Sequence, residues 1–312
     1  MKILLELLIL AVGFVLLVKG ADWFVDGACN VAERFHIPQL VIGLTIVAMG
    51  TSAPEAAVSI TAASKGVADI TIGNIVGSNI MNILIILGLS AAIVPLRVGK
   101  STVRIEIPFM IGVTVLLYLL GMDGSIGFVD GLIFVACFLT YLGYLLWVAL
   151  KHPEQTEEEG SKKLKLWQAL LALALGMAMI LLGSDLAVDA ASEIARIMGL
   201  SERFIGLTIV ALGTSLPELF TSVTAARKGN ADIAIGNIVG SNIFNILFVV
   251  GLSSLLIPVP FASAFLIDTV IATGVAVLLW VCCMKSGKLS RWSGFLMLGC
   301  YAAYFAYLIL MH

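Results

Sequence analysis

Two glutamates stand in the same six-residue pattern at two places in the chain. Glu55 closes Gly-Thr-Ser-Ala-Pro-Glu at 50–55, and Glu218 closes Gly-Thr-Ser-Leu-Pro-Glu at 213–218, each within a long apolar stretch. A carboxylate near the centre of a bilayer costs at least about 2.5 kcal/mol on insertion scales, so two related carboxylates indicate a function. The alternative is a protonated glutamate that is hydrogen-bonded to a neighbouring helix. We interpret the pair as cation ligands.

The residues around each glutamate supply further oxygen atoms. Pro54 and Pro217 have no amide hydrogen, so we expect them to free the carbonyls of Gly50 and Gly213, four residues earlier. Unwound backbone at membrane depth is tolerated only where it is buried in protein or lines a cavity. Calcium prefers six to eight oxygen ligands, whereas zinc and copper sites use His or Cys. The pattern therefore favours a hard cation such as Ca²⁺.

A polar stripe follows each glutamate in the next apolar segment. Its members are spaced four apart and therefore share one face of a helix; they are Asn74, Ser78 and Asn82, and Asn237, Ser241 and Asn245. Such amides also join helices by hydrogen bonds, which is the alternative reading. With a buried glutamate on the preceding segment, we favour a polar cavity.

The charge of the two carboxylates favours a divalent ion. A single Ca²⁺ neutralises two negative charges, whereas Na⁺ needs at least two ions for the same effect. Competition between the two ions for shared oxygens predicts an exchange of one for the other.

Composition places these residues in a membrane. The chain has 312 residues, of which 60% are hydrophobic and 12% charged, with a net charge of −2 and a mean hydropathy of +1.09. These values exclude a basic nucleic-acid binder, a disordered chain and a disulfide-stapled secreted domain. A spanning helix needs about 20 apolar residues. We expect an all-α integral membrane protein with ten spans, at 3–26, 38–64, 70–95, 104–121, 125–150, 166–190, 203–227, 233–258, 265–284 and 291–311.

The chain is internally duplicated. Residues 42–82 and 205–245 are identical at 31 of 41 positions without a gap. We therefore expect a first five-helix repeat at 1–150, a polar cytoplasmic linker at 151–165 and a second five-helix repeat at 166–312. Because each half has an odd number of spans, the second is predicted to be inverted. Inverted repeats are common in secondary transporters, whose substrate sites lie near the bilayer midplane.

The basic residues predict the orientation. With the N-terminus outside, cytoplasmic connections hold thirteen Lys and Arg residues and the opposite side holds four. We expect both termini to be extracytoplasmic, in the plasma membrane or the inner membrane. The first span resembles a signal peptide, but Gly20-Ala-Asp22 recurs as Gly183-Ser-Asp185 in the sixth span, so we expect the first span to be retained.

The motifs at 50–55 and 213–218, together with Gly-Asn-Ile-Val-Gly-Ser-Asn-Ile-x-Asn at 73–82 and 236–245, resemble those of the calcium/cation antiporter superfamily, and most closely the prokaryotic sodium/calcium exchangers. The resemblance covers the whole chain. It implies a ten-helix fold with four cation sites between spans two, three, seven and eight, and sliding of spans one and six across the core. The implied ligands are Glu55 and Glu218 for calcium, Thr51, Ser52, Ser78, Thr214, Ser215 and Ser241 with the carbonyls of Ala48 and Ala211 for sodium, and Asn82 and Asn245 for the remaining site.

Some relatives have Asp in place of Asn82 or Asn245, among them potassium-dependent exchangers. Both positions are amides here, which disfavours potassium coupling. The leading hypothesis is an antiporter of Ca²⁺ against Na⁺. A Ca²⁺/H⁺ antiporter stays open, because a buried glutamate can bind a proton instead of a metal.

An ion channel and an intramembrane enzyme are the other classes. A conducting pore needs a continuous lining of weak sites. An enzyme could use the two carboxylates for acid–base chemistry, but the sequence shows no nucleophile–base pair and no cofactor loop. We therefore expect no enzymatic activity, no cofactor and no nucleic-acid partner. The expected partners are membrane lipid and inorganic cations as substrates, and the sequence leaves the oligomeric state open.

Overall fold

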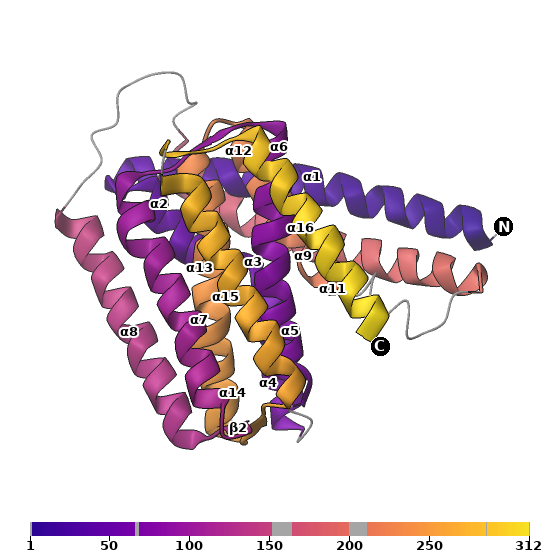
Figure 1. Ribbon diagram of the computed structural model, residues 1–312. Coiled ribbons are helices and arrows are strands. Elements are labelled where there is room, and N and C mark those ends of the chain that lie inside the picture. Colours follow the sequence, from indigo (N-terminus) through magenta and orange to yellow (C-terminus); the bar gives the residue numbers. More distant parts are fainter. Residues whose placement is uncertain (1, 66–68, 152–163, 200–210, 285, 312) are drawn as a thin grey trace.

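In the computed structural model, which describes residues 2–65, 69–151, 164–199, 211–284 and 286–311, the chain is a bundle of helices (Figure 1). Lipid offers no hydrogen-bond partners, so a spanning segment must satisfy its backbone internally, as a helix does. Seven helical segments of the described chain are long and apolar enough to cross a membrane, or eight if one bent pair counts as a span. Part of the expected span 203–227 lies outside the described residues.

The first half contains eight α-helices and three π-helical segments among its described residues. In chain order its elements are α1 (Lys2–Phe35), α2 (Gln39–Ile42), a π segment (Gly43–Val47), α3 (Ala48–Thr51), α4 (Ala53–Ser64), α5 (Asp69–Met81), a π segment (Asn82–Leu87), α6 (Gly88–Ile93), β1 (Leu96–Arg97), a π segment (Thr102–Glu106), α7 (Ile107–Gly121), β2 (Ser125–Ile126) and α8 (Phe128–Lys151).

The described part of the second half repeats this order, except that no π segment precedes α15. Its elements are α9 (Leu166–Ile197), α11 (Ala211–Thr214), α12 (Leu216–Arg227), α13 (Ala231–Phe244), a π segment (Asn245–Val250), α14 (Gly251–Leu256), β3 (Val259–Pro260), α15 (Ser263–Met284), β4 (Lys288–Leu289) and α16 (Arg291–Met311).

Four two-residue strands of the described chain, which the sequence did not predict, tie the halves together. β1 pairs antiparallel with β4, with Leu96 opposite Leu289. β2 pairs antiparallel with β3, with Ile126 opposite Val259. Each ladder therefore joins a connection of one half to a connection of the other.

The long helices α1 and α9 lie side by side and cross the rest of the bundle obliquely (Figure 1). They touch backbone to backbone, because a Cβ atom at Gly20 would lie 2.8 Å from the carbonyl oxygen of Gly176. Glycine permits this close approach, as in other helix pairs that pack through small residues. Lys2 at the start of α1 pairs with Glu193 near the end of α9, so the helices run antiparallel.

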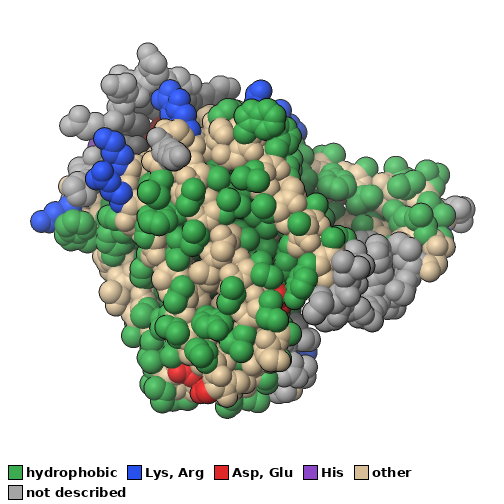
Figure 2. Space-filling model, viewed as in Figure 1, with side chains coloured by type: hydrophobic (Ala, Val, Ile, Leu, Met, Phe, Trp, Pro, Cys, Tyr) green, Lys and Arg blue, Asp and Glu red, His purple; other side chains and the backbone are tan. Residues whose placement is uncertain are grey.

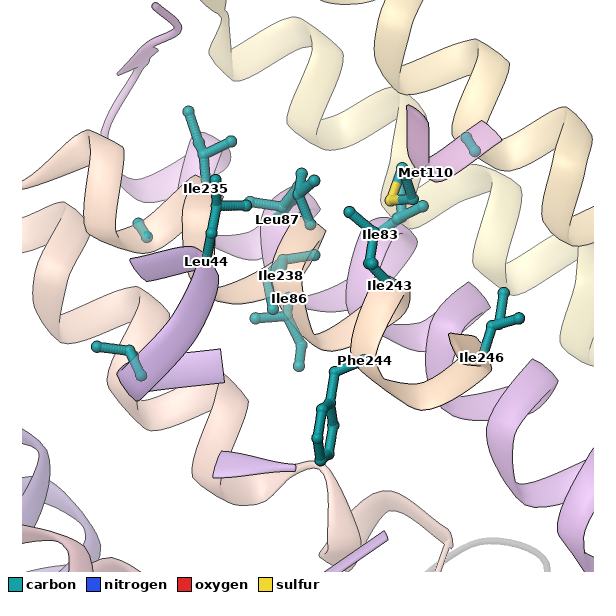
Figure 3. Packing of buried hydrophobic residues seen from close by; sticks show 14 of the residues in the cluster. Leu44, Ile83, Ile86, Leu87, Met110, Ile235, Ile238, Ile243, Phe244 and Ile246 are labelled. Atoms are coloured by element: carbon teal, nitrogen blue, oxygen red, sulfur yellow. The ribbon is translucent and has the colours of Figure 1, made fainter. Parts of the chain in front are cut away.

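The core is formed by the segments that follow the two glutamates. Within the most apolar window of each segment, 94% of Ala231–Leu256 and 78% of Thr71–Ile93 is buried, against 17–33% for the other candidate spans. Figure 3 shows Ile83, Ile86 and Leu87 of the first half among Ile235, Ile238 and Ile243 of the second. The two polar stripes therefore lie on the most enclosed elements.

The outer surface is mainly apolar. Figure 2 shows hydrophobic side chains spread across the visible face of the bundle, with most of the visible Lys and Arg at its upper end and most of the visible Asp and Glu at its lower end. Large side chains such as Leu139 and Leu146 of α8 are more than half exposed. This distribution fits a protein surrounded by lipid.

Candidate cation-binding site

Both glutamates lie in the first turn of a helix that starts at a break. Ser52 (φ −81°, ψ 8°) separates α3 from α4, and the two helical segments on either side are bent by 51°. Ser215 (φ −92°, ψ 4°) makes the equivalent break between α11 and α12. Proline is favoured in a first helical turn because its missing amide has no partner there. The break thus places Glu55 and Glu218 at helix N-termini, where negative charge is stabilised.

The two carboxylates are buried and linked crosswise by serine hydroxyls. Glu55 and Glu218 are each 1% exposed. Ser52 Oγ donates to Glu218 Oε1 over 2.8 Å, and Ser215 Oγ donates to Glu55 Oε1 over 3.5 Å. The carboxylates are also close enough to repel each other electrostatically. Two like charges this close in a low-dielectric interior are costly, and either a bound cation or a proton would relieve the cost.

Further oxygens converge on the carbonyl of Ala48. The hydroxyl of Thr51 lies 3.3 Å from this carbonyl oxygen and 2.9 Å from Asn237 Oδ1. Ser241 Oγ, from the other half, lies 3.4 Å from the same carbonyl oxygen. One backbone carbonyl and two hydroxyls therefore meet beside the carboxylate pair.

Four asparagines bridge the two polar stripes. Asn82 Nδ2 donates to Asn242 Oδ1 over 2.9 Å, and Asn245 Nδ2 donates to Asn79 Oδ1 over 3.2 Å. Asn82 and Asn245 each start a π-helical segment, a geometry often found at functional sites. The segment of Asn82 packs on α12, which carries Glu218, and the segment of Asn245 packs on α4, which carries Glu55.

Four oxygens of this cluster are buried acceptors to which no described residue donates a hydrogen bond. They are Glu55 Oε2, Glu218 Oε2, Asn82 Oδ1 and Asn245 Oδ1. Buried polar atoms nearly always have a partner, so unpaired ones call for an explanation. Carboxylate and amide oxygens are hard ligands, and they match what Ca²⁺ or several Na⁺ ions would bind.

The remaining expected ligands are placed as follows. Ser78 is buried on α5, at 6% exposure. Thr214 is half-buried, and its hydroxyl interacts with Glu55. Ala211 starts α11, and its side chain lies outside the described residues.

Two expectations differ from the structure. Asn74 donates to Ser59 and Asn237 donates to Ser222, so the alternative reading as interhelical amide bonds describes these two positions. The Gly213 carbonyl, which Pro217 cannot engage, accepts a 2.9 Å hydrogen bond from Ser184 of α9 and so has a partner outside the expected cluster.

Three buried polar residues were missed by the sequence reasoning. Asn79 and Asn242 lie in the duplicated motif, three positions before Asn82 and Asn245, and their repetition was the available signal. Glu106 is a third buried carboxylate of the described chain, at 2% exposure, where the sequence indicated two. It accepts hydrogen bonds from Ser101 and Tyr144, so it has its own partners.

Comparisons with known proteins identify the family of the chain. The family model for sodium/calcium exchanger proteins matches twice, at residues 5–147 and 168–310. The chain is 42% identical over 287 residues to the putative antiporter CaxA of Alkalimonas amylolytica, covering 90% of both chains. It is 31% identical to the sodium/calcium exchanger MaX1 of Methanosarcina acetivorans, covering 97% of this chain and 98% of that one.

Solved structures of the sodium-calcium exchanger NCX_Mj have the same fold. A structure soaked with Na⁺ and Sr²⁺ superposes with a TM-score of 0.86 and 34% sequence identity, covering 97% of this chain and 99% of that one. With a doubled family match, full-length relatives and a full-length structural match, the chain belongs to the sodium/calcium exchanger family.

Proposed function

We propose that this multi-pass membrane protein exchanges Ca²⁺ against Na⁺ by alternating access around Glu55 and Glu218, near the bilayer midplane. Calcium binds between the two carboxylates and the amide oxygens of Asn82 and Asn245. Sodium binds at the flanking hydroxyls and carbonyls, namely those of Ala48, Thr51, Ser52, Ser78, Ala211, Thr214, Ser215 and Ser241. The family membership supports a cation antiporter with Ca²⁺ as a substrate, and the ion assignments are our own.

The unpaired oxygens carry the proposal. Four buried acceptors, two of them from carboxylates, receive no hydrogen bond from the described residues. A proton on each glutamate would leave the amide oxygens unused, whereas a cation engages all four. The oxygen-only chemistry of the cluster suits Ca²⁺, with its six to eight ligands and flexible geometry.

Sodium is favoured over protons as the counter-ion by the flanking oxygens. Proton coupling needs only the two carboxylates, because a buried glutamate discharges itself by binding H⁺. The hydroxyls of Thr51 and Ser241 beside the Ala48 carbonyl have no such role, but they are typical Na⁺ ligands. We therefore rank Ca²⁺/Na⁺ exchange above Ca²⁺/H⁺ exchange.

We propose ten spans in two inverted repeats, 1–150 and 166–312, joined by the cytoplasmic linker 151–165. The doubled family match and the 31 identities in 41 aligned positions support the duplication. The antiparallel pairing of α1 with α9 and the two cross-half β-ladders support a two-fold arrangement. The gathering of Lys and Arg at one end of the bundle supports a cytoplasmic face there (Figure 2). We propose that both termini lie outside.

Flux into sealed vesicles tests the function. With Na⁺ loaded inside the vesicles, the outward Na⁺ gradient should drive ⁴⁵Ca²⁺ uptake. A pH gradient at the same fixed membrane potential should not drive it. Glu55→Gln and Glu218→Gln should each abolish this uptake, because one charge no longer balances Ca²⁺. Glu106→Gln is the matched control, since Glu106 is buried outside the cluster. Undiminished uptake in either site variant, or uptake driven by pH alone, would refute the proposal.

A further inference from the structure

Asn79 and Asn242 are joined by two reciprocal hydrogen bonds, in which the side chain of each donates to the backbone carbonyl of the other. Asn79 Nδ2 donates to the carbonyl oxygen of Asn242 over 3.2 Å, and Asn242 Nδ2 donates to the carbonyl oxygen of Asn79 over 3.1 Å. A backbone carbonyl can only accept a hydrogen bond, so the NH₂ group of each side chain must face it. The amide orientation of both residues, normally ambiguous, is therefore fixed by the bonding pattern.

This orientation is passed on to the expected ligands. With its NH₂ group engaged, Asn242 presents Oδ1 to Asn82, whose Nδ2 donates to it over 2.9 Å. Asn79 likewise presents Oδ1 to Asn245, whose Nδ2 donates over 3.2 Å. The NH₂ groups of Asn82 and Asn245 are thereby engaged by Asn242 and Asn79. The Oδ1 atoms of Asn82 and Asn245 stay buried without a donor among the described residues.

We propose that Asn79 and Asn242 are positioning residues that aim the amide oxygens of Asn245 and Asn82 at the transported cation. This inference rests on the proposed function, in which Asn82 and Asn245 are ligands. Each positioning residue acts across the sequence repeat: Asn242 of the second half sets a ligand of the first, and Asn79 of the first half sets a ligand of the second. All four side chains are buried, with exposures of 4% or less.

The need for such residues follows from the shape of an amide. Its oxygen and NH₂ ends are nearly the same size, so packing alone does not choose between them. If the side-chain amide of Asn82 were flipped, its NH₂ group would face the cation. The ligand oxygen would then be replaced by hydrogens of partial positive charge, which repel a cation. Only a hydrogen-bond partner that cannot change between donor and acceptor prevents this flip. Here two backbone carbonyls, which only accept, fix the amides of Asn79 and Asn242, and these fix Asn245 and Asn82 in turn.

A double-mutant cycle tests the assignment. Equilibrium ⁴⁵Ca²⁺ binding to the purified full chain gives Kd for Asn82→Ala, Asn242→Leu and the double variant. We expect each single change to raise Kd roughly tenfold, as for loss of a bond to a charged group. The double variant should bind no worse than Asn82→Ala alone, because Asn242 acts through Asn82.

The internal repeat supplies the matched control. Asn242→Leu combined with Asn245→Ala should multiply the two single effects, because Asn245 is oriented by Asn79. A merely structural role for Asn242 would multiply with both ligand variants, and that result would overturn the inference. If Asn242→Leu does not elute as folded protein, Asn242→Ala replaces it, since it removes the same amide and leaves room for water.

The result for Asn82→Ala separates this inference from the proposed function. If Asn82→Ala weakens Ca²⁺ binding and Asn242→Leu does not, the positioning role is refuted while the ligand assignment stands. If Asn82→Ala and Asn245→Ala both leave Kd unchanged, the ligand assignment fails, and the positioning role fails with it. Weakening by both members of the pair, without additivity, supports both.

Discussion

Ser52 Oγ donates a 2.8 Å hydrogen bond to Oε1 of Glu218, so a hydroxyl next to one helix break holds the carboxylate beyond the other. The reciprocal bond from Ser215 to Glu55 is 3.5 Å long, at the limit of a hydrogen bond. The two halves of the duplicated motif are therefore chemically equivalent but not equally bonded in this conformation. Each glutamate thus receives a hydroxyl donor from the opposite half.

The difference in length predicts unequal effects of removing the two hydroxyls. Ser52→Ala should raise the half-saturating Na⁺ concentration about tenfold, because a bond to a charged group is lost. Ser215→Ala should raise it less, since its bond is already weak. Sodium-dependent ⁴⁵Ca²⁺ uptake measures both, with Ser64→Ala on the exposed end of α4 as the control. Equal effects, or a larger effect of Ser215→Ala, would contradict the bonding asymmetry.

Replacing a glycine at the contact between α1 and α9 by a residue with a Cβ atom should push the two helices apart. At Gly20 this Cβ atom would lie 2.8 Å from the carbonyl oxygen of Gly176, which is backbone and cannot move aside alone. Gly20→Ala should therefore lower the thermal unfolding midpoint and the transport rate. Gly112→Ala on α7 is the control, because a Cβ atom there would have no neighbour within 4 Å, and alanine favours a helix by about 1 kcal/mol over glycine. An unchanged midpoint for Gly20→Ala would show that α1 and α9 are not packed as described.

The burial of Glu55 and Glu218 in the interior could be predicted from sequence, because the cost of placing a carboxylate in an apolar segment is local. A glutamate in an apolar run is expensive wherever its neighbours lie, and duplication of Glu55 as Glu218 marks it as functional. The helix breaks at Ser52 and Ser215 likewise follow from a proline two positions later. Such features depend on few residues, all close together in the chain.

The hydrogen-bond partners could not be predicted, because they come from distant segments. Spacing places Asn74 and Asn82 on one helical face, but it does not say that Asn74 bonds to Ser59 while Asn82 bonds to Asn242. The hydrogen bond that Glu106 accepts from Tyr144 likewise comes from another helix, α8. Direction of an amide or a carbonyl is set by tertiary packing, which a periodic pattern does not contain.

An ion pair attaches α1 of the first half to the end of α12 of the second half. Lys228 lies 2.8 Å from Asp26 Oδ1 and 3.4 Å from Asp22 Oδ1, and it donates to the Asp22 carbonyl oxygen over 3.0 Å. Lys65 is the equivalent residue of the first half, and it is exposed. α1 also packs along α12, whereas α9 makes little contact with α4 among the described residues.

Removing Lys228 should therefore destabilise this conformation more than removing Lys65. Lys228→Gln leaves the carboxylates of Asp22 and Asp26 to repel each other, and we expect a loss of about 1 kcal/mol, the upper range for a partly exposed pair. Lys65→Gln should change the free energy of unfolding by less than about 0.5 kcal/mol. Thermal unfolding in detergent at low and high salt measures the difference, which should shrink with salt. Equal losses in the two variants would contradict the asymmetry.

Calcium itself should stabilise the fold through the carboxylate pair. A ligand that binds only the folded state stabilises it by about 2.7 kcal/mol at a hundredfold excess over Kd. The unfolding midpoint should therefore rise on adding Ca²⁺ and fall back on chelation. Mg²⁺ should act weakly, because it demands a small octahedral shell and dehydrates reluctantly. Glu55→Gln and Glu218→Gln should abolish the rise, whereas Glu106→Gln, whose carboxylate has its own partners, should retain it. A rise that survives both site substitutions would mean that Ca²⁺ binds elsewhere on the protein.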